Sequence, residues 1–106
     1  MDNNKGLKFD SGKQSYFAMP LVLLKPLADV FVAGIKKGYG TFNCLQPFDD
    51  YSQRFYDAQM RHVEASQIDP LAIDPEVGCY HQAQVAFSAL VRLHNALREQ
   101  EKNKSK

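Results

Sequence analysis

The segment DAQMRHVEAS contains four side chains that can bind or react with a ligand, all within eight consecutive positions: Asp57, Arg61, His62 and Glu64. Carboxylates and imidazoles hold divalent ions, and guanidinium groups bind phosphate. On a helix, Asp57, Arg61 and Glu64 share one face because they are three or four positions apart. The same spacing also fits a solvent-exposed ladder of ion pairs, and a histidine beside an apolar stripe is commonly a packed, hydrogen-bonded residue. Both interpretations stay open.

A second polar group lies in the segment IDPEVGCYH, which contains Asp74, Glu76 and His81. With Glu64, these residues could supply oxygen and nitrogen ligands to Mg²⁺ or Mn²⁺. The spacing matches no standard ligand motif. Asp74 as a helix cap and Glu76 in the first helical turn would explain the two acids without a metal, and His81 fits a solvated helix face equally well.

Two glycine-containing segments could approach a phosphate. KFDSGK places Lys8, Asp10 and Lys13 around a glycine, and KKGYGTFN places further lysines, Tyr39 and Asn43 around two more. Glycine lets the backbone approach an anion, lysine supplies positive charge, and tyrosine can stack on a base. Neither segment is a Walker loop, and each also fits an ordinary turn with solvated lysines.

The elements that would position these residues are three helices. The first is expected between Pro20 and Gly38, and it either kinks at Pro26 or begins its regular part there. The second covers about residues 50–67. Its apolar stripe consists of Tyr51, Phe55, Ala58, His62 and Ala65. The stripe beside it consists of Arg54, Asp57, Arg61 and Glu64.

The third helix is expected to start with Asp74 as N-cap and Pro75 at the first position, and to run to about Gln100. An apolar seam with alternating spacings of three and four follows it. The seam consists of Cys79, Ala83, Ala86, Leu90, Leu93 and Leu97. Because this seam is longer than two neighbouring helices require, we predict a homo-oligomer in which a second chain completes a bundle.

These elements predict an all-α fold in one domain, 1–106, with an N-terminal loop (1–18), a helical core (19–100) and a polar frayed tail (101–106). The 106 residues carry a net charge of +1, which argues against a nucleic-acid binder held by bulk charge. No apolar run is long enough to span a membrane, and the start lacks the plan of a secretion signal. We expect a cytoplasmic protein (host cytoplasm if the source is viral) with free thiols at Cys44 and Cys79.

Five segments in this order resemble the N-terminal dATP/dGTP diphosphohydrolase family, mostly small phage and bacterial proteins. They are GLKFDSGK, Pro20, AGIKKGYGTFN, RFYDAQMRH and IDPEVGCYH, and the resemblance covers about residues 6–97. Members of that family cleave purine deoxynucleoside triphosphates to monophosphate and pyrophosphate. The family is similar to the all-helical MazG-like pyrophosphohydrolases, which act as oligomers with magnesium or manganese.

The resemblance implies a role for each matching residue. Nucleotide binding falls to Lys8, Asp10, Lys13, Lys37, Tyr39, Asn43, Arg61 and His62. Catalysis is expected of Glu76 and His81, and metal binding of Asp74 and Glu76. Glu64 lies in no segment that matches the family, and we expect it in both roles because its carboxylate could serve as a metal ligand or a base.

Three departures from the family pattern leave other functions open. Cys44 stands where the family has tryptophan, Leu71 where it has an acid, and Gln84 where it has a second histidine. A site that lacks one carboxylate and one imidazole holds a divalent ion less well. The first alternative is therefore a protein that captures a nucleotide, or a cyclic nucleotide signal, without cleaving it. The second is a helical interaction scaffold.

Overall fold

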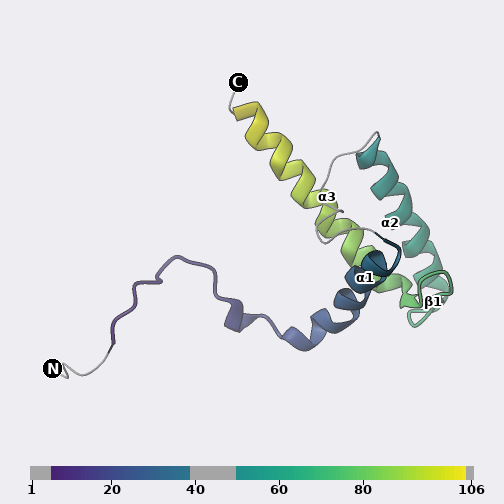
Figure 1. The fold of residues 1–106 in the computed structure, drawn as a ribbon, viewed down its shortest axis with the longest axis horizontal. Helices are drawn as coiled ribbons and strands as arrows, with labels where there is room; N and C mark the ends of the chain where they lie inside the picture. Colours follow the sequence, from purple (N-terminus) through teal and green to yellow (C-terminus); the bar gives the residue numbers. More distant parts are fainter. Residues whose placement is uncertain (1–5, 39–49, 105–106) are drawn as a thin grey trace.

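The computed structural model describes residues 6–38 and 50–104, in which three α-helices dominate. They are α1 (Lys25–Lys36), α2 (Tyr51–Ile68) and α3 (His81–Lys104). Helices α2 and α3 pack along one another, and α1 packs against α3 (Figure 1). The predicted all-α, three-helix architecture is confirmed.

The segment before α1 is an exposed arm that extends away from the helices (Figure 1). It contains two short 3₁₀ turns, Tyr16–Ala18 and Leu21–Leu24. Pro26 lies in the first turn of α1, where a missing N–H breaks no helical hydrogen bond, so the regular helix begins there without a kink. At the other end Gly38 has a φ of 94°, and its N–H donates to the Ile35 carbonyl at 3.0 Å. This left-handed residue ends α1 as the sequence predicted.

Helix α2 confirms both predicted stripes. Every member of the stripe that starts at Tyr51 is half-buried, and every member of the stripe that includes Arg61 is exposed. Asp50, with a φ of 57°, precedes the helix, which ends within one residue of its predicted position.

The predicted start of the third helix at Asp74 is wrong. Residues 73–80 form a hairpin in which β1 (Ile73–Asp74) pairs with β2 (Cys79–Tyr80), Asp74 opposite Cys79. The Asp74 carbonyl accepts hydrogen bonds from the N–H groups of Val77 (3.3 Å) and Gly78 (2.8 Å), which is one helical turn. Gly78 then adopts a φ of 75°, which ends that turn and returns the chain to an extended strand. Helix α3 begins only after this hairpin, at His81.

The far end of α3 also differs from expectation, because the predicted frayed tail is helical to Lys104. Two i,i+3 ion pairs support this end, Glu99 with Lys102 and Glu101 with Lys104, each with an N–O distance of 3.6 Å. The predicted seam does not pack inside the chain beyond Ala83. Leu90, Leu93 and Leu97 are 52%, 57% and 52% exposed.

The packed face of α3 is offset from that seam and consists of Ala83, Ser88, Val91 and Asn95. Phe87 joins the three helices: its ring lies 5.1 Å from that of Phe31 in α1 and 6.3 Å from that of Phe55 in α2. Cys79 is a buried free thiol, as expected, whereas Cys44 lies outside the described residues. None of the helices in the described ranges is both long and apolar enough to cross a membrane.

Candidate functional site

Three side chains from three elements converge at one end of the α2–α3 pair. His62 comes from the middle of α2, Asp74 from β1, and His81 from the first position of α3. One ligand atom from each lies within 4.8 Å of the other two. The Nδ1 atoms of the two histidines are 2.8 Å apart, with the rings tilted by 39°. We refer to His62, Asp74 and His81 as the His-Asp-His cluster.

The hairpin fixes the Asp74 carboxylate. Its Oδ1 accepts a hydrogen bond from the Glu76 backbone N–H at 2.9 Å, and its Oδ2 accepts one from the Gln84 side-chain amide at 3.1 Å. Each oxygen keeps a lone pair for a further partner. The carboxylate is therefore held at both oxygens while remaining able to bind a cation.

The surroundings shift the charge balance of the cluster. Burial lowers the pKa of His62, and the neighbouring charge of His81 lowers it further, against the opposing effect of Asp74. Burial alone would raise the pKa of Asp74, but the hydrogen bonds from Glu76 and Gln84 outweigh it and hold that pKa below its usual range. A neutral imidazole beside an ionised carboxylate is the protonation state that binds a metal ion.

This balance predicts how the metal-free protein responds to acid. Below the ordinary histidine pKa of 6.5 the unfolded chain takes up a proton that folded His62 resists, so stability falls as the pH drops. Thermal unfolding between about pH 7.5 and 5.5 should show this loss, and His62→Gln should flatten the slope. His94→Ala, on the exposed part of α3, is the control that keeps the slope. A melting temperature that rises toward pH 5.5 would contradict the prediction.

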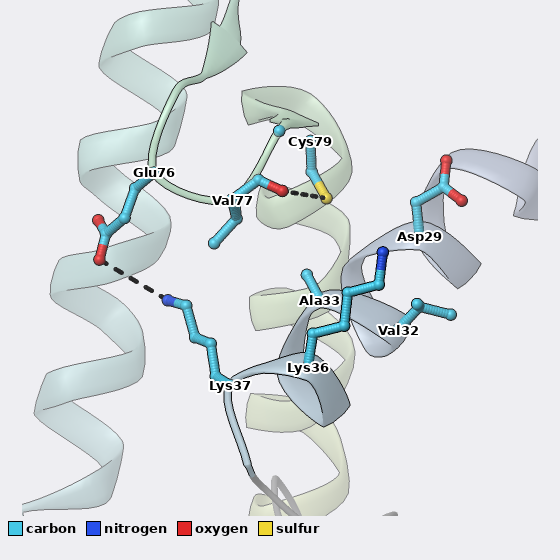
Figure 2. Close-up of a pocket in the computed structure, with 9 residues that line it drawn as sticks. Asp29, Val32, Ala33, Lys36, Lys37, Glu76, Val77 and Cys79 are labelled. Atoms are coloured by element: carbon cyan, nitrogen blue, oxygen red, sulfur yellow. Dashed lines mark hydrogen bonds and ion pairs between the residues drawn. The ribbon is translucent and has the colours of Figure 1, made fainter.

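A groove lies between the end of α1 and the turn of the hairpin (Figure 2), where it is bordered by Glu76, two positions after the cluster residue Asp74. It has a volume of about 390 Å³ and is bordered by Asp29, Lys36, Lys37 and Glu76 among others. The Lys37 Nζ lies 3.7 Å from a Glu76 oxygen, and the two side chains are 43% and 76% exposed. Such a pair contributes little to stability, so the lysine charge remains available to an anion. Glu76 also acts electrostatically on His62, which links the groove to the cluster.

Several predicted site residues lie elsewhere. Glu64 follows His62 by two positions, about 200° around the helix, and is exposed outside the cluster. Arg61 is exposed, although its charge still acts on His62. Lys8, Asp10 and Lys13 belong to the exposed arm, away from the cluster (Figure 1). Tyr39 and Asn43 lie outside the described residues, so their roles stay predictions.

The family assignment agrees with this arrangement. The model of the dATP/dGTP diphosphohydrolase N-terminal family matches residues 3–105. The chain belongs to this family. Neither a curated protein nor a solved structure matches it. Membership of the dATP/dGTP diphosphohydrolase family indicates a nucleotide-related function, consistent with a metal-competent cluster beside a lysine-lined groove.

The chain's departures from the family pattern can now be placed. Gln84, which stands where the resemblance implies a second histidine, donates its hydrogen bond to Asp74 instead of offering an imidazole. Leu71 is exposed just before the hairpin. The sequence placed Asp74 and His81 in one possible ligand set with Glu64 and Glu76, but it assigned His62 to nucleotide binding and not to that set. The glycine at position 78 was the signal for the hairpin that brings them together.

Proposed function

We propose that this chain cleaves purine deoxynucleoside triphosphates to the monophosphate and pyrophosphate, at a site formed by the His-Asp-His cluster and the adjoining groove. The observation that supports the proposal is the convergence of His62, Asp74 and His81 from three elements, in a member of this family whose hairpin also borders a groove lined by Lys36 and Lys37. A triphosphate carries several negative charges, and the lysines offer the positive charge to hold it.

The donor set of the cluster fits a divalent ion, with two imidazole nitrogens and one carboxylate. His62, Asp74 and His81 would hold that ion. When bound, it would bind phosphate oxygens and offset the negative charge that builds up during cleavage. The expected ligands Glu64 and Glu76 are replaced in this role by the two histidines.

The chain's own residues supply the remaining functions. A water oxygen forms a bond to the α-phosphorus, and the bond from that phosphorus to the bridging oxygen breaks so that pyrophosphate leaves. We assign to Glu76, whose side chain is 76% exposed, the role of accepting the proton of the water. Lys37 neutralises charge on the departing pyrophosphate once the nucleotide has displaced it from Glu76.

Phosphorus NMR of dGTP and dATP incubated with the protein and Mn²⁺ tests the proposal. We expect the monophosphate and pyrophosphate as the only products. Intact nucleotide at high protein concentration, or release of orthophosphate from the terminal position, would contradict it.

Capture without cleavage is a second candidate, favoured by Gln84 in place of an imidazole and Leu71 in place of an acid. It predicts that calorimetry detects binding of a purine nucleotide or cyclic nucleotide without metal, with the ligand recovered intact. Failure of every purine nucleotide to bind below millimolar concentration would exclude it.

A second copy of the chain is the partner that we propose for the exposed apolar surface. Among the described residues, large apolar side chains of all three helices are exposed, Phe31 on α1, Met60 on α2 and Leu93 on α3 among them. Contiguous exposed apolar surface of this kind is typical of an interaction site. Leu90, Leu93 and Leu97 form a continuous exposed row on α3, which we assign to this interface.

The interface predicts a specific response to charge. Leu93→Glu should convert the oligomer into monomers at micromolar concentration, because a carboxylate buried without a partner disfavours association strongly. Light scattering after size-exclusion chromatography measures the mass. Ile68→Glu, at a site 86% exposed at the end of α2, is the matched control and should leave the mass unchanged. A wild-type protein that is already monomeric would rule out the interface.

A further inference from the structure

The two histidines of the His-Asp-His cluster are separated as if they were ligands of one ion. Metal–nitrogen bonds of about 2.05 Å place the two nitrogens about 2.9 Å apart at the right angle of an octahedral site, and about 3.3 Å apart at a tetrahedral angle. The observed Nδ1–Nδ1 distance is 2.8 Å. Without a metal, the same distance is a hydrogen bond in which one ring donates and the other accepts. Replacing that shared proton by a cation requires little movement of either ring.

The chemical nature of the three donors selects among cations. Imidazole nitrogen is a good ligand for Co²⁺ and Zn²⁺, whereas Mg²⁺ prefers carboxylate, carbonyl and water oxygens. Two of the three cluster donors are nitrogens. We therefore propose that His62, Asp74 and His81 form a site for one divalent transition-metal ion that discriminates against Mg²⁺.

The site is preformed on the carboxylate side and open on the other. Asp74 is held by the Glu76 backbone and by Gln84, at 2.9 and 3.1 Å, so little ordering is needed when an ion arrives. All three residues are half-buried, so solvent or a ligand can reach the ion. Three protein ligands leave coordination positions vacant for water or a phosphate oxygen, which is typical of catalytic metal sites.

The inference concerns the same site as the proposed function, but its test needs no nucleotide, so the two can fail separately. Tag-free protein is titrated with Co²⁺, without any nucleotide, in buffer that contains a large excess of Mg²⁺. Calorimetry gives the stoichiometry, and the visible absorption of the ion reports nitrogen coordination. We expect one ion per chain at micromolar concentration, unaffected by the Mg²⁺.

Two variants connect this binding to the cluster. Asp74→Asn keeps the oxygen that accepts from Glu76 and should therefore preserve the hairpin, but it removes the charged ligand. His81→Ala removes an imidazole. Each should weaken Co²⁺ binding by about 100-fold or more. The matched controls are Asp69→Asn, whose carboxylate accepts from the Leu71 N–H in the same way at 2.9 Å, and His94→Ala. Both should bind as the wild type does.

Three outcomes would overturn the proposal. Co²⁺ binding that survives both cluster variants would place the ion elsewhere, and binding abolished by Mg²⁺ would show an oxygen-type site. Absence of saturable binding below millimolar Co²⁺ would identify the histidines as a structural hydrogen-bonded pair. If the protein binds the metal but cleaves no nucleotide, the metal site stands and only the proposed hydrolysis is contradicted.

Discussion

Asp74→Asn is expected to lower the turnover of dGTP and dATP by about 100-fold or more. The substitution removes the negative charge that balances an ion at the cluster. Because Asn retains the oxygen that accepts from the Glu76 N–H at 2.9 Å, the hairpin should persist. Pyrophosphate release under saturating nucleotide and Mn²⁺ measures the effect.

The matched control for this experiment is Asp69→Asn. Asp69 caps a turn through the same oxygen-to-backbone contact, at the same 2.9 Å, but it is exposed and outside the cluster. Its turnover should equal that of the wild type. Similar losses in the two variants would mean that Asp74 acts through the backbone turn rather than through its charge, and would contradict its assignment as a ligand.

Phe87→Ala is expected to lower the free energy of unfolding by about 3 kcal/mol. The centroid of the Phe87 ring lies 5.1 Å from that of Phe31 in α1 and 6.3 Å from that of Phe55 in α2. Loss of the ring therefore weakens the packing of all three helices. Since folded domains are stable by only about 5–15 kcal/mol, this is a large fraction of the total. Chemical denaturation at fixed protein concentration measures the change.

This variant also tests how the groove depends on the core. Helix α1 carries Lys36 and Lys37 to the hairpin, and its aromatic contact with α3 is made through Phe31 and Phe87. Nucleotide binding should therefore weaken along with stability. Ile68→Ala, at an exposed position, is the control and should change neither quantity by a measurable amount. Wild-type stability in Phe87→Ala would contradict the packing described here.

Residue periodicity was sufficient to predict the helices but not the connection between the second and third. The stripe of Tyr51, Phe55, Ala58, His62 and Ala65 predicted the buried face of α2 because side chains at these intervals share a face. Asp74-Pro75 predicted a helix start with good local reasons, and a single helical turn does form there. Gly78 stops it, because one residue in a left-handed conformation allows strand pairing to compete with helix propagation.

The candidate site could be predicted only in part for the same reason. If a helix began at Asp74, Glu76 and His81 would both lie on that helix. Glu64, on the preceding helix, would then be the expected third ligand. The hairpin instead folds Asp74 back to the start of α3, beside His81 and His62. Residue spacing along one helix does not predict that the chain folds back in a hairpin. The family resemblance does indicate which residue types belong to the site.

The most direct test of the proposed site is a crystal structure of the protein with Mn²⁺ and a non-hydrolysable dGTP analogue, with the metal located by its anomalous scattering. We expect one peak bound by His62, Asp74 and His81 and by a phosphate oxygen of the analogue, with Lys37 turned from Glu76 toward the phosphates. A metal held by other acids such as Glu64, or a nucleotide ordered away from the groove with the two histidines still bonded to each other, would contradict it.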